Sequence, residues 1–406
     1  MKKSLLELSC CLLPLLFLAC GGKSAIKASE QAETEAIKKA SELIADKKYE
    51  SAFKLLDSLD PGNSKPNIVL LKEDIALNYF VTSFMHRAFA LKDIDKSEDI
   101  MNYRGSEGEF NMRLFQVDSI LENLIKIYPD NCKLYKGLGY FYYEVSNKYS
   151  EKWFKDDSEL LTLVQTNFQK TIDGGCADYL PYYALGIANL RQEKHKESIP
   201  YFLKSIEMNN ENAESHYNLA YAYLYAGDWQ NVLKYAKNAL ALYTDPTYKS
   251  DAARMLGYTY EKLKDDKNAL ESYELANKID PENYHNLKNL LDLYVKTGNE
   301  KTEEITKIFF GLAPDNPTIY NDLDEIYHGS NKEKDLIAFY KSQFSAFKDN
   351  EKVEGALNFY LGEAYIEMDK KIAEEYFLKS KEVFSKVFPK DHQVFGVIEE
   401  NLKQCK

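Results

Sequence analysis

The chain has 406 residues, of which 45 % are hydrophobic and 13 % aromatic, so it can bury a sizeable core and is not a disordered polypeptide. Its formal net charge of −12 at pH 7 argues against a nucleic-acid partner, because phosphates would repel an acidic surface. Such a balance commonly serves solubility, and the alternative is that it attracts a basic partner.

The first twenty residues have the pattern of a targeting segment. Lys2 and Lys3 precede an apolar run over 8–18, which is too short for a typical membrane-spanning helix, and Cys20 follows it. The segment resembles a bacterial lipoprotein signal, although Phe17 stands where that family usually has an aliphatic residue.

The lipoprotein resemblance implies removal of residues 1–19 and attachment of lipid, including palmitate, to Cys20. An ordinary secretory signal or a short uncleaved anchor is the alternative. The small and polar residues over 20–32 are expected to form a flexible tether between the lipid and the folded part.

Residues 33–131 predict irregular helical repeats with an insert. A helix pair starts near Thr34 and stops at Asp60-Pro61-Gly62-Asn63, where proline and glycine break the periodicity. Apolar spacing then predicts a long helix over 67–91, a polar stretch over 92–110 and a further helix over 111–127.

A helix-pair pattern recurs three times between residues 179 and 283. Its marker positions are Leu185-Gly186, Leu219-Ala220 and Leu256-Gly257, which lie 34 and 37 residues apart. The small residue lets a second helix approach closely, and a period of this length predicts a solenoid. A tyrosine follows the marker leucine by four residues in Leu138/Tyr142, Leu219/Tyr223, Leu256/Tyr260, Leu290/Tyr294, Leu323/Tyr327 and Leu361/Tyr365, whereas Asn189 follows Leu185.

The middle unit, residues 213–246, resembles a tetratricopeptide repeat (TPR). The resemblance implies an all-α fold, a right-handed superhelical α-solenoid of about seven to eight helix pairs. We expect the regular solenoid over 132–390 and a capping helix within 391–406.

In the TPR family the first helix of each pair lines a concave groove that binds protein segments. The positions that match in this sequence are the groove residues Lys136, Tyr140, Tyr143, Tyr183, Ile187, Arg191, Tyr217, Tyr221, Leu224, Tyr225, Arg254 and Tyr258. Tyrosine offers a large, rigid contact area with a polar tip, which favours recognition, but it is also a routine packing residue of these repeats. The family's clamp for a terminal carboxylate is not expected, because Tyr183 and Ile187 occupy positions that would need Lys and Asn.

Three cysteines follow Cys20. Cys132 and Cys176 both lie in turns that open successive repeats, so a disulfide between them is one reading in an oxidising compartment. Free thiols are the other, because neighbouring repeats stand roughly 8–10 Å apart, farther than a disulfide spans without adjustment. Cys405 is terminal and is expected to be a free thiol.

No catalytic or cofactor motif is present. The six histidines are scattered, none forms an H-E-x-x-H pair or lies beside a cysteine at zinc-finger spacing, and no phosphate-binding or dinucleotide fingerprint occurs. We therefore expect a protein that is not an enzyme and binds no cofactor and no metal.

Two functions remain open at this stage. The favoured one is a lipid-anchored scaffold or adaptor of the bacterial cell envelope that binds a protein or peptide segment, held on the outer membrane and facing the periplasm or the surface. The alternative is a substrate-binding or enzymatic lipoprotein whose insertions at 92–110 and 147–158 build a small-molecule pocket near Trp153, although that tryptophan could equally pack on the core.

Overall fold

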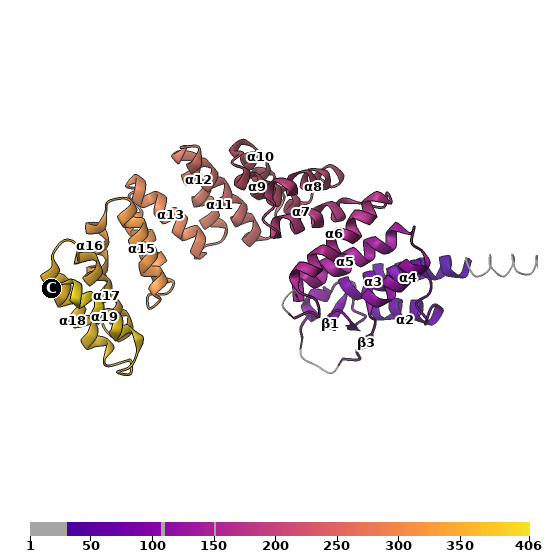
Figure 1. The fold of residues 1–406 in the computed structure, drawn as a ribbon, viewed down its shortest axis with the longest axis horizontal. Coiled ribbons are helices and arrows are strands. Elements are labelled where there is room, and N and C mark those ends of the chain that lie inside the picture. The colour runs from indigo at the N-terminus through magenta and orange to yellow at the C-terminus, as the bar shows by residue number, and fades with distance from the viewer. Residues whose placement is uncertain (1–30, 107–109, 150–151) are drawn as a thin grey trace, which may run out of the picture. The chain divides into compact units, whose positions relative to one another are not determined.

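The computed structural model describes residues 31–106, 110–149 and 152–406. They form two compact units, an N-terminal unit that ends at Asn210 and a C-terminal unit that begins at Glu211. The expected signal segment over 1–19, Cys20 and most of the tether lie outside the described residues. Helix pairs build both units, as expected for the TPR-like α-solenoid (Figure 1).

The N-terminal unit contains helices and one small sheet. A helix over 31–45 comes first. The elements that follow are α2 (Tyr49–Leu59), α3 (Pro66–Asn78), β1 (Phe80–Phe84), β2 (Ala88–Leu91), the 3-10 helix η1 (Ile100–Tyr103), β3 (Arg113–Leu114), α4 (Val117–Ile127), α5 (Cys132–Tyr149), α6 (Asp157–Asp173), α7 (Tyr179–Arg191) and α8 (His195–Met208).

The described C-terminal unit is helical throughout. Its helices are α9 (Ala213–Ala226), α10 (Trp229–Leu242), α11 (Pro246–Lys262), α12 (Asp266–Ile279), α13 (Tyr284–Thr297), α14 (Thr302–Gly311), α15 (Pro317–Gly329), α16 (Glu333–Gln343), α17 (Glu351–Tyr365), α18 (Lys370–Phe384) and α19 (Gln393–Gln404). The last of these lies where the capping helix was expected.

The expected long helix over 67–91 is wrong. Helix α3 stops at Asn78, and the chain turns into the antiparallel pair β1 and β2, with Phe84 opposite Ala88. The turn between them holds Met85 and His86 at positive φ, 48° and 54°. The helical stripe ends where aromatic and β-branched residues begin, and these residues favour strands.

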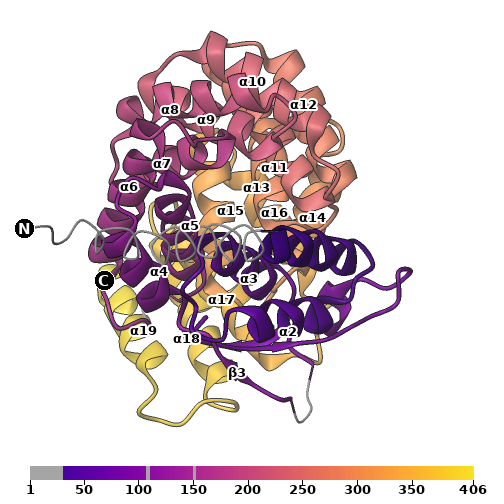
Figure 2. The ribbon, with the colours of Figure 1, turned by 90° about the vertical axis from the view of Figure 1, so that its right-hand side faces the viewer.

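The start of the expected helix over 111–127 is also wrong. Residues Arg113–Leu114 form β3, which completes a three-stranded sheet in the order β1-β2-β3, and α4 begins only at Val117. The sheet end lies against α2, where the rings of Phe53 and Phe115 are 5.4 Å apart and Arg113 pairs with Glu50 at 3.4 Å (Figure 2).

Glycines on first helices let their partner helices approach closely, as the marker spacing predicts. The pairs α5/α6, α7/α8, α11/α12 and α17/α18 lie side by side (Figure 1). A Cβ atom would come within 3.0 Å of an aromatic ring of the partner helix at Gly139 (facing Phe168), Gly186 (Phe202), Gly257 (Tyr273) and Gly362 (Phe377). A real side chain at these positions would force the helices apart.

The tyrosines that follow the marker leucines serve packing. Tyr142, Tyr294 and Tyr327 are at most 3 % exposed. At the exceptional position, the amide of Asn189 donates to the carbonyl of Leu185 at 2.8 Å, so a buried polar side chain satisfies itself within its own helix.

The turn after β1 meets the second insertion, residues 147–158, in a packed aromatic cluster. The ring of buried His86 lies 5.0 Å from that of Tyr149, and the Arg87 guanidinium lies 5.3 Å from the ring of Phe154. Trp153 is 8 % exposed and packs on Phe141 at 5.9 Å. Trp153 therefore belongs to the core, which was the simpler of the two sequence readings.

Candidate functional site

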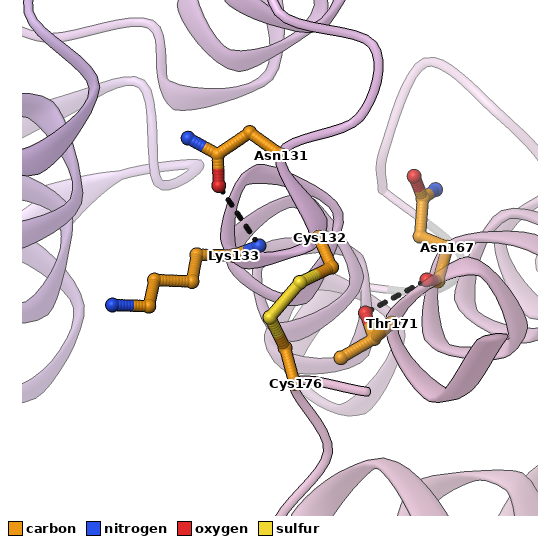
Figure 3. Close-up of a disulfide and its surroundings, with 6 residues drawn as sticks. All are labelled: Asn131, Cys132, Lys133, Asn167, Thr171 and Cys176. Carbon is orange, nitrogen blue, oxygen red and sulfur yellow. Dashed lines mark hydrogen bonds between the residues drawn. A yellow bond between two sulfur atoms is a disulfide. The ribbon is translucent and has the colours of Figure 1, made fainter. Parts of the chain in front are cut away.

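A disulfide fixes one edge of the N-terminal unit. Cys132 opens α5, Cys176 follows α6, and their bonded sulfurs hold the Cα atoms 5.8 Å apart (Figure 3). The distance between neighbouring repeats does not prevent this disulfide, because the bond joins the start of α5 to the end of α6 within one packed pair. Gly174 makes this approach feasible, since a Cβ there would lie 2.5 Å from the Cβ of Cys132.

A cavity of about 640 Å³ lies beside this disulfide, between α3, α5 and α7. Three groove residues, Lys136, Tyr140 and Tyr143, line it on the α5 side. The remaining lining residues are Leu70, Glu73, Asp74, Asn78, Lys133, Gly137, Glu144, Cys176, Tyr179 and Leu180. Apart from Cys176, the lining residues come from α3, α5 and α7, and those of α3 are not among the groove residues expected from the TPR resemblance. We call it the N-terminal cavity.

Glu73 is the buried acid of the N-terminal cavity. Its side chain is 3 % exposed, and its Oε1 atom has no hydrogen-bond partner. Burial raises the pKa of this carboxyl to about 8, with nearby Asp74 raising it further and Lys136 opposing the shift. Gly137 makes room for it, since a Cβ there would lie 2.4 Å from Glu73 Oε2.

A short hydrogen-bond chain joins α5 to α3 at the N-terminal cavity. The Tyr140 hydroxyl donates to Asn78 Oδ1 at 2.7 Å, and the Asn78 amide donates to Asp74 Oδ1 at 2.8 Å. Burial raises the pKa of Tyr140, so its phenol keeps its proton and remains a donor. The ammonium of Lys136 pairs with Asp178 at 2.6 Å.

The groove residues of α7 lie against α5. The rings of Tyr183 and Tyr143 meet edge to face at 6.4 Å. The guanidinium of Arg191 donates to Ser146 and to Asn147 at the C-terminal end of α5, while Ile187 is half-buried. These side chains join neighbouring first helices within the N-terminal unit.

In the C-terminal unit, α9 presents a column of tyrosines. The hydroxyl of Tyr221 donates to that of Tyr225 at 3.0 Å, and Tyr225 is 56 % exposed. Tyr217 packs edge to face on Tyr243 at 6.2 Å, and burial raises the pKa of its phenol. Leu224 is half-buried beside them. Spacing of four residues places the three groove tyrosines on one helix face.

Helix α11 supplies the charged neighbours of this column. Arg254 pairs with Asp251 at 2.7 Å. The charge of Asp251 raises the pKa of Tyr217 and that of Arg254 lowers it, so the groove residues Arg254 and Tyr217 lie near each other. Tyr258 is 36 % exposed, with the Lys262 ammonium 4.8 Å from its ring centre. Tyr258 also borders a smaller cavity of about 330 Å³.

Sequence reasoning missed Glu73, Asp74 and Asn78. They lie on α3, whose apolar spacing continues in the sequence into the sheet, so the end of this helix was predicted wrongly. A usable signal was present in the pair of glycines at 137 and 139: Gly139 serves the usual helix packing against Phe168, whereas Gly137 accommodates a carboxyl group.

The described residues contain no cluster of three or more His, Cys, Asp or Glu side chains arranged to hold a metal ion. Over the same part of the chain, no helix combines the length and apolarity needed to cross a bilayer.

Sequence profiles of the tetratricopeptide repeat match residues 201–233 in one case and residues 181–212 and 255–283 in another. None of the curated proteins is detectably similar to this chain in sequence.

Several solved structures are similar. A tetratricopeptide repeat protein from Parabacteroides merdae ATCC 43184 is 18 % identical, with 65 % of this chain and 98 % of that chain covered and a TM-score of 0.40. YrrB, described as a TPR protein with an unusual peptide-binding site, is 20 % identical, with 43 % and 89 % covered and a TM-score of 0.32. Pseudomonas aeruginosa pilF is 12 % identical, with 54 % and 96 % covered and a TM-score of 0.40.

The helix pairs, the glycine-to-aromatic packing and the matched profiles agree on one conclusion. This chain contains tetratricopeptide repeats over 181–233 and 255–283, within an α-solenoid of helix pairs, and this kind of repeat suggests a scaffold for protein–protein interaction.

Proposed function

We propose that the protein is a lipid-anchored, non-enzymatic scaffold of the bacterial cell envelope, and that the tyrosines on its first helices bind a protein partner. The lipid is carried by Cys20, and the favoured membrane is the outer membrane. The observation that carries the binding part of this proposal is the division of the tyrosines into two sets.

The buried tyrosines that follow marker leucines are committed to packing, whereas two of the groove tyrosines are exposed to solvent. Tyr294 and Tyr327 are at most 3 % exposed, whereas Tyr225 and Tyr258 are 56 % and 36 % exposed. Packing requires the first set only. Exposed aromatic side chains gathered on one face are the composition of a recognition surface, because they give large contact area at small entropic cost.

The disulfide supports the envelope part of the proposal. Bridged cysteines persist in oxidising compartments and are rare in the cytosol. The bond between Cys132 and Cys176 fits a protein that is exported before it folds, and the lipoprotein-like segment ending at Cys20 would provide that export.

A crosslinking pull-down from membranes tests the binding face. The test variant replaces Tyr217, Tyr221 and Tyr225 with glutamate. We expect a defined crosslinked species in the natural protein and its loss in this variant, since three added carboxylates oppose an aromatic contact.

The matched control is Asn238→Glu, Ala241→Glu and Leu275→Glu, which adds the same charge at exposed positions of second helices in the same unit. The control should keep the crosslinked species, and both variants should keep the helical circular dichroism of the natural protein. An identical crosslinking pattern in all three proteins would remove the α9 column from the proposal.

Metabolic labelling tests the anchor independently. In a bacterial host supplied with an alkyne-tagged fatty acid, the natural chain should become labelled and enter the detergent phase, while Cys20→Ala should do neither. A lipoprotein signal-peptidase inhibitor should retain the longer precursor band. Equal labelling of both chains would contradict lipidation at Cys20.

A further inference from the structure

We propose that the N-terminal cavity binds the guanidinium or ammonium group of a basic side chain on the protein partner, an assignment that rests on the proposed function for its view of the occupant as a protein. Glu73 and Asp74 supply the negative charge, and Tyr140, Tyr143 and Tyr179 supply the aromatic walls.

The first observation is a buried carboxyl oxygen without a hydrogen-bond partner. Glu73 lines the cavity, is 3 % exposed and has an unpaired Oε1 atom. A buried acceptor without a partner is costly, and a folded protein usually satisfies such groups. A ligand that brings hydrogen-bond donors into the cavity would satisfy it.

The second observation is that the neighbouring donors are already engaged. The Tyr140 hydroxyl donates to Asn78, and the Lys136 ammonium pairs with Asp178. Lys133, the other cation of the lining, is exposed, so water screens its charge. The cavity therefore offers acceptors and holds few free donors, which favours a cationic ligand over an anionic one.

The aromatic lining and the volume select the kind of cation. Three tyrosines border a space of about 640 Å³, which is far larger than a bare metal ion requires. Guanidinium and alkylammonium groups gain from aromatic faces as well as from carboxylates. The formal net charge of −12 complements a basic partner at longer range.

The titration of Glu73 gives the cavity a measurable signature. Its pKa is raised to about 8, so the carboxyl is mainly protonated at neutral pH and must lose its proton when a cation binds. Affinity for the cation should therefore rise with pH between about pH 6 and about pH 8. The charged and titratable groups that border Glu73 in the cavity are Asp74 on α3, Lys133, Lys136, Tyr140, Tyr143 and Glu144 on α5, and Tyr179 on α7.

The test is calorimetric titration of the full chain with acetyl-Ala-Arg-Ala-amide, with acetyl-Ala-Gln-Ala-amide as the uncharged comparison. Glu73→Gln removes the charge and keeps the shape. Glu207→Gln is the matched control, because Glu207 is an exposed acid of the same unit that pairs with Lys204 at 2.8 Å.

We expect the arginine peptide to bind, Glu73→Gln to weaken it about tenfold, and Glu207→Gln to leave it unchanged. Titration in buffers of different ionisation enthalpy should show proton release in the natural chain and none in Glu73→Gln. Equal binding by Glu73→Gln and the natural chain, or no binding of the arginine peptide, would overturn the assignment.

Two further measurements separate the sources of failure. Butylguanidine, a free alkylguanidinium with a single charge, would overturn the assignment to a protein partner if it bound as tightly as the peptide. The crosslinking experiment on α9 of the C-terminal unit does not involve Glu73. Its success together with failure here would leave the scaffold function standing and remove only the cation site.

Discussion

The two units use the same helix pair but differ in how regularly they repeat it. In the C-terminal unit, first and second helices succeed one another with little interruption, and side-chain caps such as Asp228 and Asn350 begin several of them. In the N-terminal unit, a sheet follows α3, a second insertion follows α5, and a disulfide joins the ends of α5 and α6.

This difference shows where a repeat protein places polar chemistry. Regular pairs bring small residues against aromatic rings, as Gly257 does against Tyr273, so the two helices of a pair lie close together. The irregular N-terminal unit brings α3, which belongs to no regular pair, against α5 and thereby encloses Glu73. The repeat period therefore predicts the helix packing, and the break in the period after α3 coincides with the N-terminal cavity.

The largest expected effect that separates the units comes from the disulfide. Replacing Cys132 and Cys176 with serine opens a loop of 44 residues and should lower the unfolding free energy of the N-terminal unit by about 4 kcal/mol. Urea unfolding can be followed through Trp153 in a Trp229→Phe background, and through Trp229 in a Trp153→Phe background for the C-terminal unit.

Only the Trp153 transition should shift markedly, and Cys405→Ser should shift neither, because Cys405 is a free thiol. Equal losses of unfolding free energy in the Trp153 and Trp229 transitions would show that the two units unfold together. No loss in either transition would argue against the disulfide.

The next effect is the pH dependence contributed by Glu73. Its carboxyl titrates at about 8 in the folded chain and near 4.5 when unfolded, so between these values the folded chain holds a proton that the unfolded chain has lost. Its contribution to stability is complete below about pH 4.5 and declines by a few kcal/mol as the pH rises through 8.

Glu73→Gln should remove this decline from the Trp153 transition and leave the Trp229 transition as it was. An unchanged pH slope in Glu73→Gln would mean that Glu73 is charged in the folded protein.

A smaller effect tests whether helix packing follows one rule along the chain. A Cβ at residue 257 would lie 2.5 Å from the Tyr273 ring, so Gly257→Ala should destabilise the C-terminal unit by about 1 to 2 kcal/mol despite the better helix propensity of alanine. Gly396→Ala is the control, since nothing lies within 4 Å of a Cβ there. Stability that rises in both variants would refute the close-approach explanation.

The smallest effect concerns helix caps. The carboxylate of Asp228 accepts from the backbone N–H of Asn231 at 3.2 Å, so Asp228→Ala should cost about 1 kcal/mol. In the N-terminal unit, Lys194 begins α8 without a side-chain cap, and Lys194→Ala should change little. Denaturant midpoints measure both, and equal shifts would undo the contrast between a capped and an uncapped helix start, two kinds that occur in both units, since Asp178 caps α7 and α14 has no side-chain cap.

The regular part of the fold was predictable because its signal is local and repeated. The markers Leu185-Gly186 and Leu256-Gly257 predict the helix pairs. In each pair the glycine leaves room for one aromatic ring of the partner helix. Helix ends were predictable where Asp60 or Asp245 begins a break, because their side chains accept from the next backbone N–H groups.

The sheet and the N-terminal cavity were harder to predict for a physical reason. The alternation in Phe80–Phe84 is too short to outweigh the helical stripe that precedes it, and pairing with Ala88–Leu91 is a tertiary event. Glu73 was not singled out, because a charged residue in a helix usually lies at the surface. Its burial depends on α5, which lies about 60 residues further along the chain.

The central claim, that the first-helix tyrosines contact the partner directly, can be tested by placing a photoreactive amino acid at position 221. The matched position is 241, on the exposed side of α10 in the same unit. Irradiation of living cells should yield one discrete crosslinked species from position 221 and none from position 241. The same species from both positions, or from 241 alone, would contradict the claim.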